Sequence, residues 1–373
     1  MAAGEIVLIT GYPSWLARAV CAEVLRTDKF ARVQALVRAS QVGAAQAALD
    51  ELPEKDRSRV AFAVGDAAAI DFGLSGAEYK SLTREVTRIH HCAQVTHSAA
   101  DRKAAARVNI GGAREAIEFA TCCSTLECLV FYSTVQVAGD RTGIVHEDDL
   151  KAGQSFRNVV EETKARAEKL MRSAMGHVPV AVVRPSTVVG DSRTGEVDRF
   201  DGPSLLILLV VTSPPDLALP LPGRGDERLN LVPIDWVVRA SVALGRDPRA
   251  IGRTFHLVDP RPPTARQVFE LVARAGGRPG PRGSIPANLA KALLRAPGLE
   301  RISNGPRAFL EALTTSVTYD ARNANELLSA LGVGDCPPLE TYVDKLVEYV
   351  QEHVRKRRAS KREAPTESDD RQV

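Results

Sequence analysis

Short apolar runs and longer amphipathic segments alternate along the first half of the chain. The short runs are rich in β-branched residues and predict strands, whereas apolar residues at helical spacing predict helices. The predicted strands cover residues 5–10, 32–38, 60–64, a short run ending at His91, 129–133 and 178–184, and the clearest helices cover residues 15–25, 104–119 and 161–174. Elements that alternate at these lengths require parallel strands with right-handed crossovers. The pattern therefore predicts an α/β fold with a Rossmann-type, doubly wound parallel sheet.

The pattern changes after Pro185. Proline and glycine cluster at residues 213–225 and 276–286, which indicates loops and short helices of a smaller region. Residues 231–235 and 254–258 are predicted to return to the sheet as strands. A final amphipathic helix carries one apolar stripe, formed by Leu339, Tyr342, Val343, Leu346, Val347, Val350 and Val354. We therefore predict a sheet domain over residues 1–190, a smaller C-terminal region over 191–354 and a disordered charged tail over 355–373.

Composition narrows the classes of function. Apolar residues make up 44% and charged residues 25% of the 373 residues, which fits a globular protein. The net charge of +3 is too small to favour nucleic-acid binding. A strand at residues 5–10 leaves no room for a signal peptide, and the apolar run 205–211 is too short to span a bilayer. We expect a soluble, cytoplasmic protein.

The cysteines lack the spacing of metal ligands, so no metal site is expected. They are Cys21, Cys92, Cys122, Cys123, Cys128 and Cys336. We interpret them as small buried hydrophobic residues of a reducing compartment.

The first strand runs into Thr10-Gly11-Tyr12-Pro13-Ser14-Trp15-Leu16-Ala17 and then a helix, which is the setting of a dinucleotide phosphate loop. This loop resembles the Thr-Gly-x-x-Gly-Phe-Leu-Gly loop of extended short-chain dehydrogenases/reductases, with Ser14 and Ala17 in place of two glycines. The resemblance implies that residues of this loop bind an NAD(P) cofactor, namely Thr10, Gly11, Ser14, Trp15, Leu16 and Ala17. A plain strand–turn–helix is the alternative.

Three further positions bear on the cofactor. The second strand ends at Arg38 instead of an acidic residue, and an arginine there suits a 2′-phosphate, which favours NADPH over NADH. A solvated surface arginine is the alternative. By resemblance, Asp66 and Ala67 contact the adenine, while Ala93 and Gln94 lie beneath the nicotinamide ribose.

Residues 158–170 resemble the active-site helix of the same family, which reads Asn-x-Tyr-x-x-Ser/Thr-Lys-x-x-Ala-Glu. Lys164 matches the family lysine, which also binds the cofactor, and Val160 stands where the family has its catalytic tyrosine. Positions i and i+4 share one face of a helix, so that tyrosine and lysine meet at the reacting carbonyl. Because Val160 has no phenol, this chain lacks that general acid, which is typically worth about 10²–10⁴ in rate.

Other motifs complete the resemblance. Tyr132-Ser133-Thr134 and Gly139 match the family's Ser-Thr motif, so Thr134 takes the position of the catalytic hydroxyl. Asn109 matches an asparagine that orients water and the lysine. Each residue also has a purely structural alternative. Thr134 is then a strand residue, Asn109 a hydrogen-bonding residue of a helix, and Lys164 a surface lysine.

The segment 184–195 resembles one branch of the family, which holds thioester reductases and fatty acyl reductases of the male-sterility type. The resemblance implies that Pro185 and Val188 line the nicotinamide. It extends over residues 5 to about 350. It assigns NAD(P) binding to residues 1–190 and substrate binding to residues 191–354.

Together these features predict an NAD(P)H-dependent reductase that transfers hydride to an activated carbonyl, a ketone, of an apolar secondary-metabolite or lipid-like substrate. The run 205–211 and a helix at 286–297 are predicted to form an apolar pocket wall, with ordinary packing as the alternative. A homodimer is compatible with this prediction, and a thioester substrate would come from a separate carrier protein. Two other functions stay open: a nucleotide-dependent regulatory module, and an epimerase or dehydratase.

Overall fold

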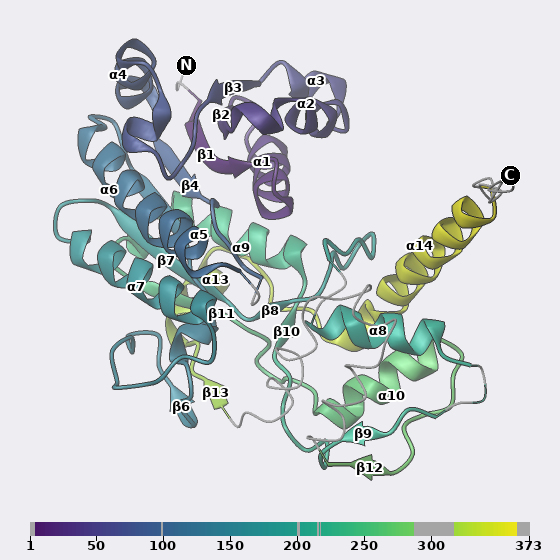
Figure 1. Cartoon of the computed structure of the whole chain (residues 1–373). Helices are drawn as coiled ribbons and strands as arrows, with labels where there is room; N and C mark the ends of the chain where they lie inside the picture. The colour runs from purple at the N-terminus through teal and green to yellow at the C-terminus, as the bar shows by residue number, and fades with distance from the viewer. Residues whose placement is uncertain are drawn as a thin grey trace, which may run out of the picture. The chain divides into compact units, whose positions relative to one another are not determined.

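The computed structural model describes residues 4–97, 100–199, 202–214, 216, 218–286 and 317–363 (Figure 1). The chain divides into two compact units. Unit 1 comprises Met1–Val188, Asn230–Pro262 and Thr314–Pro338, and unit 2 comprises Val189–Leu229, Pro263–Leu313 and Leu339–Val373. The chain therefore leaves unit 1 after Val188 and returns to it twice, with Asn230–Pro262 and with Thr314–Pro338.

Unit 1 is built on a seven-stranded parallel sheet with strand order β11-β7-β5-β4-β1-β2-β3. The strands are β1 (Ile6–Tyr12), β2 (Arg32–Val37), β3 (Val60–Val64), β4 (Arg88–His91), β5 (Cys128–Tyr132), β7 (Val180–Pro185) and β11 (Thr254–Leu257). The strand order reverses between β1 and β4, which is the switch point of a doubly wound sheet. The predicted Rossmann-type fold is confirmed.

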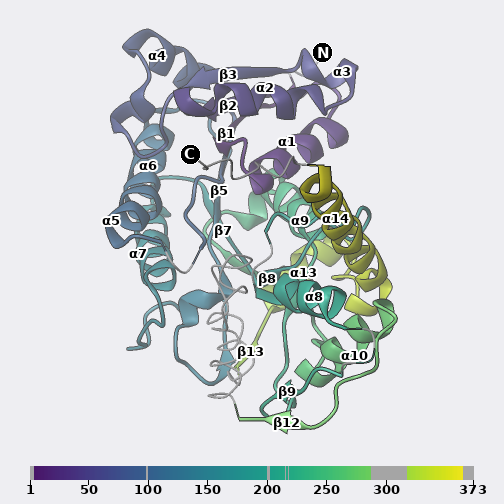
Figure 2. The ribbon, with the colours of Figure 1, turned by 45° about the vertical axis from the view of Figure 1, so that its right-hand side comes forward.

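Helices cover both faces of this sheet (Figure 2). One core lies against α1 (Trp15–Thr27), α2 (Val42–Asp50), α9 (Ile234–Arg246) and α13 (Arg322–Ala330). The other lies against α4 (Gly76–Glu85), α6 (Gly112–Cys122) and α7 (Val159–Ala174). The remaining short elements are η1 (Ala39–Gln41), α3 (Glu54–Arg57), η2 (Ile70–Gly73), η4 (Val135–Ala138) and η5 (Pro248–Ala250).

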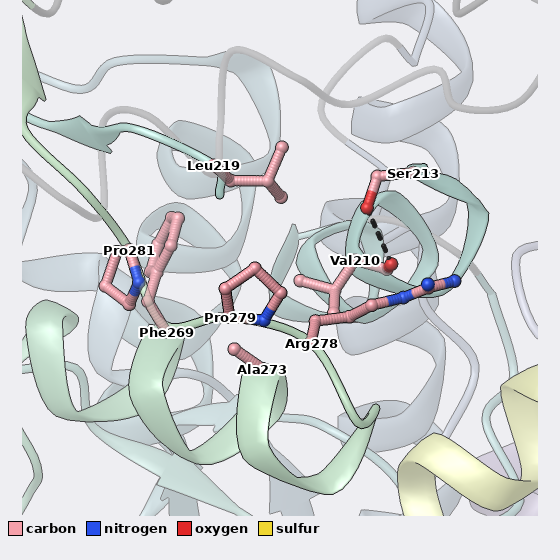
Figure 3. Close-up of a pocket in the computed structure, with 8 residues that line it drawn as sticks. All are labelled: Val210, Ser213, Leu219, Phe269, Ala273, Arg278, Pro279 and Pro281. Carbon is pink, nitrogen blue, oxygen red and sulfur yellow. Dashed lines mark hydrogen bonds between the residues drawn. The ribbon is translucent and has the colours of Figure 1, made fainter. Parts of the chain in front are cut away.

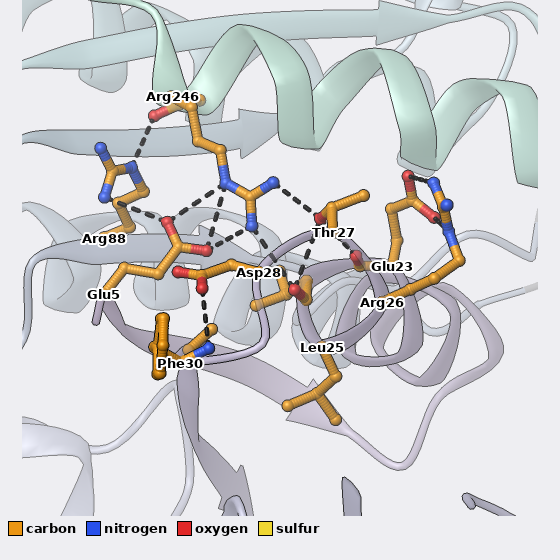
Figure 4. A network of polar contacts seen from close by, with 12 residues as sticks. Glu5, Glu23, Leu25, Arg26, Thr27, Asp28, Phe30, Arg88 and Arg246 are labelled. Carbon is orange, nitrogen blue, oxygen red and sulfur yellow. Dashed lines mark hydrogen bonds and ion pairs between the residues drawn. The ribbon is translucent and has the colours of Figure 1, made fainter.

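The amino ends of the strands are held by a polar network around Glu5 (Figure 4). Arg88, the first residue of β4, lies 3.1 Å from Glu5 through Nη1 and Oε2. Arg246, at the end of α9, pairs with the same carboxylate and donates to Thr27 Oγ1 at 2.6 Å. This network closes the amino edge of the sheet, so loops that carry chemistry are left to the opposite, carboxyl edge.

Residues 102–122 form one continuous helical stretch with a wide turn inside it. The helix α5 (Arg102–Ala105) leads into a π-helical segment, η3 (Ala106–Gly111), which continues as α6. A single regular helix over residues 104–119 was predicted, so the wide turn is a difference from the prediction. Such turns are frequent at functional sites because they redirect a side chain out of helical register. Here the wide turn carries Asn109.

Residues 231–235 do not join the main sheet, contrary to the prediction. Only Leu231–Val232 are extended, as β10, and they pair with β8 (Thr187–Val188) in a separate two-stranded sheet. Pro233 then caps α9, whose first turn includes Asp235. The predicted return of residues 254–258 is confirmed, because β11 pairs with β7. A third pair, β6 (Gly143–Val145) with β13 (Val317–Tyr319), also lies in unit 1.

Unit 2 contains α8 (Gly202–Thr212), α10 (Ala265–Ala275), η6 (Leu339–Thr341) and α14 (Val343–Glu363), with the strand pair β9 (Leu221–Pro222) and β12 (Ser284–Ile285). The predicted stripe of the final helix is buried from Leu339 to Val350, and Val354 is half-buried. The helix continues to Glu363, so residues 355–363 are helical where a disordered tail was predicted. Residues 364–373, and residues 287–297 of the predicted helix 286–297, lie outside the described residues.

Membrane-spanning helices and the burial of the cysteines are two further points that were predicted from the sequence. Among the described helices none is long and apolar enough to cross a membrane. Four of the cysteines are buried as expected, but Cys122 is exposed and Cys123 is half-buried. These two stand at the end of α6, where the helix leaves the core, so the expectation that all the cysteines are buried was wrong for them.

Candidate cofactor and reaction site

The predicted phosphate loop joins β1 to α1 at the carboxyl edge of the sheet. Ser14 is the N-cap of α1, and its Oγ accepts a hydrogen bond from the Ala17 amide at 3.4 Å. The first turn of α1 has no acidic residue. Free amide groups and the positive end of a 13-residue helix therefore face this loop, and a pyrophosphate binds such a helix end well.

Gly11 explains why one glycine of the loop cannot be replaced. Its φ is +79°, and a Cβ there would lie 2.7 Å from both the N and the Cα of Ala93. Thr10 reinforces the contact, since its Oγ1 accepts a hydrogen bond from the Ala93 amide at 3.1 Å. The phosphate loop and the segment after β4 thus lie against each other, as a cofactor that crosses both of them requires. The close approach of these two segments fits a bound dinucleotide.

Arg38 and Asp66 follow β2 and β3 at the same edge. The Arg38 side chain is exposed, and its Nε donates to Gln41 Oε1 at 3.0 Å. Burial raises the pKa of Asp66, but the Ala68 amide, the Arg107 guanidinium at 2.9 Å and the charge of Arg38 outweigh it and lower that pKa overall. Asp66 is therefore ionised and paired with Arg107, and it also interacts with the charge of Arg38.

Lys164 is the most unusual group of the site. It lies on α7 with 3% of its surface exposed, and its Nζ donates to Gln94 Oε1 at 2.6 Å and to the carbonyl oxygen of Tyr132. Burial lowers its pKa to about 7, although the charge of Glu168 acts in the opposite direction. A lysine near neutrality can both hold a charge and release a proton.

Thr134 and Val160 are the two other predicted positions around the reacting carbonyl, and each is placed by the element that carries it. Thr134 is the second residue after β5, whose last residue, Tyr132, provides the carbonyl that Lys164 contacts. Thr134 also caps η4 by accepting from the Gln136 amide at 3.2 Å. Val160 is buried one turn before Lys164 on α7. Asn158 starts this helix, since its Oδ1 accepts from the amides of Val160 and Glu161.

Asn109 connects the π turn to two parts of the site. Its Oδ1 accepts from the Val95 amide at 2.8 Å, and its Nδ2 donates to the Val95 carbonyl at 3.2 Å and to Thr163 Oγ1 at 2.9 Å. Thr163 is the neighbour of Lys164. Asn109 therefore fixes the segment after β4 against α7 through Thr163, the neighbour of Lys164.

A buried ion-pair network lies one turn beyond Lys164, and the sequence alone assigned it no role. Glu168 is fully buried, accepts from Ser133 Oγ at 2.5 Å and pairs with Arg184 Nη2 at 2.6 Å. Arg172 lies 3.0 Å from the same carboxylate. Glu168 and Arg184 each lie within a segment that resembles the family, and the signal for the network was Arg184, a charged residue in the otherwise apolar strand β7.

Arg184 also fixes the end of β7, where the nicotinamide was predicted to lie. Pro185 ends the strand and is buried, and Val188 ends β8 half-buried. Ser186 between them is buried, and among the described residues its Oγ has no hydrogen-bond partner. The rest of the motif after Val188 belongs to unit 2, where Asp191 Oδ1 accepts from the amides of Arg193 and Thr194 and so closes a turn.

A small pocket lies within unit 2, between α8, α10 and the segment after α10 (Figure 3). It is lined mainly by apolar side chains, including Val210, Leu219 and Phe269, with Arg278 along one side. It has room for about one water molecule. The run 205–211 lies in α8 and is largely buried in unit 2, as packing alone would give.

Comparisons with known proteins identify the family. A model of the NAD-binding domain of male sterility proteins matches residues 9–241. The glycine betaine reductase ATRR of Emericella nidulans is 28% identical over 223 residues, which cover 58% of this chain and 17% of that protein. The fatty acyl-CoA reductase wat of Drosophila melanogaster is 22% identical over 284 residues, which cover 65% of this chain and 54% of that protein. The chain thus spans about half or less of these relatives.

Solved structures share the fold. The terminal R domain from the myxalamid PKS-NRPS biosynthetic pathway superposes with a TM-score of 0.79 at 23% identity, covering 95% of this chain and 92% of that chain. The family model covers more than half of the chain and includes the phosphate loop, Thr134, Lys164 and the end of β7. The chain therefore belongs to the male sterility protein family of NAD-binding domains, within the extended short-chain dehydrogenases/reductases.

Proposed function

We propose that this protein is an NAD(P)H-dependent reductase that transfers hydride to an activated carbonyl of an apolar, lipid-like or secondary-metabolite substrate. The observation that carries the proposal is the buried Lys164 ammonium, which donates to the Tyr132 carbonyl at the carboxyl end of β5, two residues before Thr134 in the sequence. Relatives named as a fatty acyl-CoA reductase and an R domain support a reductase.

The cofactor is NADPH in this proposal. A bound reduced nicotinamide supplies a hydride. The loop of Thr10, Gly11 and Ser14 binds the pyrophosphate at the start of α1, and Arg38 binds the 2′-phosphate. Lys164 holds the nicotinamide ribose and places a positive charge beside the reacting carbonyl.

The missing phenol determines the substrate chemistry. Lys164 and Thr134 stabilise the oxygen as negative charge develops on it, but Val160 contributes no proton donor. A carbonyl that accepts hydride readily needs less help of this kind. A conjugated or α-hydroxy ketone fulfils this condition, and it is our main substrate class.

A thioester is the second class of activated carbonyl, favoured by the likeness to an R domain and to a fatty acyl-CoA reductase. Two-electron reduction of a thioester gives an aldehyde and releases a thiol. The acyl group would then arrive on a pantetheine arm of a separate carrier protein. Acyl-pantetheine compounds test this class without the partner.

The experiment has two stages. Calorimetric titration with NADPH and NADH tests cofactor binding, and binding of neither below millimolar concentration would contradict the proposal. Loss of reduced-nicotinamide absorbance is then followed with activated ketones, simple ketones, aldehydes and acyl-pantetheine thioesters. Tight cofactor binding with no reduction of any compound would instead favour a regulatory binding module.

A further inference from the structure

The tyrosines of unit 1 do not fill the place of the missing phenol. Each packs elsewhere: Tyr12 against Phe62, Tyr79 against Phe119, Tyr132 on His90 Nδ1 and Tyr319 against His256. Val160 itself is buried and apolar. Within unit 1, the donor that assists the substrate oxygen must therefore come from another type of side chain, or from water.

Gln94 occupies the position next to Lys164. An ammonium group only donates hydrogen bonds, so the amide oxygen of Gln94 must be the atom that faces Lys164 Nζ at 2.6 Å. The NH₂ group of the same planar amide consequently faces away from the lysine. Among the described residues this Nε2 has no hydrogen-bond partner, and the side chain is half-exposed. Its hydrogens are available to a ligand.

The backbone around Gln94 is fixed on both sides. The Ala93 amide donates to Thr10 Oγ1 at 3.1 Å, and the Val95 amide and carbonyl are both bonded to Asn109. Asn109 is in turn bonded to Thr163, next to Lys164. The Gln94 amide is therefore held between the phosphate loop and the active-site helix, which is the preorganisation that an oxyanion donor needs.

The charge of Lys164 strengthens this donor. An ammonium on the amide oxygen polarises the amide and makes its N–H groups more positive, and the effect is large in a buried, low-dielectric site. The arrangement Lys164–Gln94 thus offers a polarised N–H beside the lysine that, in the family, tunes the phenol.

We propose that Gln94 is a catalytic residue whose Nε2–H group hydrogen-bonds the substrate carbonyl oxygen in place of the missing phenol. This inference rests on the proposed reductase function. As hydride adds to the carbonyl carbon, the carbon–oxygen π bond breaks and its electron pair moves to the oxygen. The Gln94 amide stabilises that oxyanion and keeps its own protons. The oxygen then takes one proton from a solvent water, the resulting hydroxide is neutralised in bulk solvent, and the Lys164 ammonium keeps its hydrogen bond to the Gln94 amide oxygen.

Two substitutions distinguish the two roles of Gln94, which are to donate an N–H bond to the substrate oxygen and to accept a bond from Lys164. Gln94→Leu removes both the acceptor and the donor, whereas Gln94→Glu keeps an oxygen on Lys164 but has no N–H to offer. We expect both to lower kcat by about 10²-fold, the usual effect of losing one oxyanion donor. Gln46→Leu on α2, where the exposed Gln46 side chain donates to Asp50 at 2.9 Å, is the matched control. Wild-type kcat in Gln94→Glu would show that Gln94 merely supports Lys164.

A double-mutant cycle tests the replacement directly. Val160→Tyr restores a phenol, so Gln94→Leu should cost less than about threefold in that background, compared with about 10²-fold in the parent. Equal losses in both backgrounds would overturn the proposal. If Val160→Tyr does not fold, the two single Gln94 variants still decide it.

A readout without turnover completes the test. The pKa of Lys164 is measured in the cofactor-free protein by NMR of ¹³C-labelled lysine side chains, with Lys164→Arg to assign the signal. We expect Gln94→Glu to raise that pKa by about one unit or more, because it places a negative charge beside the ammonium, and Gln94→Leu to lower it. An unchanged pKa in both would refute the Lys164–Gln94 contact. If the wild-type protein reduces no carbonyl, the proposed function is wrong. If the wild type is active and both Gln94 variants keep its kcat, only this inference is wrong.

Discussion

At the scale of single residues, Lys164 owes its properties chiefly to the loss of water. Its Nζ donates to a neutral amide and to a backbone carbonyl, so neither of these two partners carries a negative charge. Burial disfavours the charged form, which is why the pKa falls to about 7. The lysine is then able to change its charge in the physiological range.

This pKa predicts a pH dependence. The ammonium form of Lys164 dominates below pH 7 and gives way to the neutral amine above it, so kcat should decrease as the pH rises through about 7. Rate measurements across this range check it. Lys164→Arg keeps a charge at every pH, and its residual activity should lack that decrease. A wild-type rate that is flat or rises through this range would contradict the role given to the ammonium.

Thr134→Val removes a hydroxyl from the site and replaces it with a methyl group of similar size. We expect a loss in kcat of about 10–10³-fold, because one hydrogen bond to the developing negative charge is removed. Thr121→Val is the control, since Thr121 is exposed on α6 and donates to the Ile117 carbonyl of its own helix. If both variants keep wild-type rates, Thr134 has no part in the chemistry.

Arg38→Ala tests the cofactor preference. The loss of a charge-assisted bond to the 2′-phosphate should raise KM for NADPH by about 10- to 10²-fold and leave KM for NADH nearly unchanged. Arg32→Ala at the other end of β2 is equally exposed and should change neither. Equal effects on both cofactors would place Arg38 away from the 2′-phosphate.

The sequence located these residues but not their contacts. Motif spacing placed Thr134 after its strand and Lys164 in the first half of its helix, because the spacing of residues along one element is local information. The bond between Lys164 and Gln94 joins residues 70 positions apart, and the pairing of Glu168 with Arg184 depends on how α7 lies on the sheet. Such contacts follow from packing, which a single sequence does not specify.

At the scale of elements, α7 is held to the sheet by Glu168 as well as by apolar packing. Its carboxylate is fully buried with Ser133, Arg184 and Arg172 around it. A buried pair contributes little beyond an apolar replacement, but the removal of one partner leaves the other charge without compensation. The stability of α7 therefore depends on keeping both partners.

Glu168→Gln should lower the free energy of unfolding by about 3–5 kcal/mol, since it leaves the buried charge of Arg184 unpaired. Urea unfolding measures this change. Glu162→Gln on the same helix removes half-exposed pairs with Arg102 and Arg166, and should cost about 0.5 kcal/mol. A similar small cost for both would mean that water reaches Glu168.

The error at residues 231–235 has a clear physical cause. Residues 231–235 were predicted as a strand of the main sheet, yet Leu231–Val232 pair only with β8 and the chain then turns into α9. A short apolar run fits a strand or the start of a helix equally well, and periodicity over five positions does not distinguish them. The strands β1, β2 and β3 were predicted within two residues of their observed bounds.

At the scale of the whole molecule, unit 1 is not a continuous stretch of chain. The predicted domain of residues 1–190 ends close to the unit boundary after Val188, but unit 1 also includes α9, β11 and α13 from later segments. These elements contribute buried residues such as Trp236, Phe255 and Leu327 to the core that contacts β1 and α1. The cofactor half of the molecule therefore needs the later chain for its own core.

This organisation predicts the behaviour of truncated proteins. A protein that ends after Val188 lacks β11 at the sheet edge and α9 against α1, so it exposes the apolar face that these elements cover. We expect it to lose cooperative thermal unfolding and to bind NADPH no longer. A protein that ends after Glu363 keeps every helix and strand of both units among the described residues, and its Tm should stay within about 2 °C of the full chain. Circular dichroism melts and cofactor titrations of the two proteins provide the comparison. Cooperative unfolding and cofactor binding by the protein ending at Val188 would show that the first segment folds alone, and that α9 and β11 stabilise the sheet without being required for it.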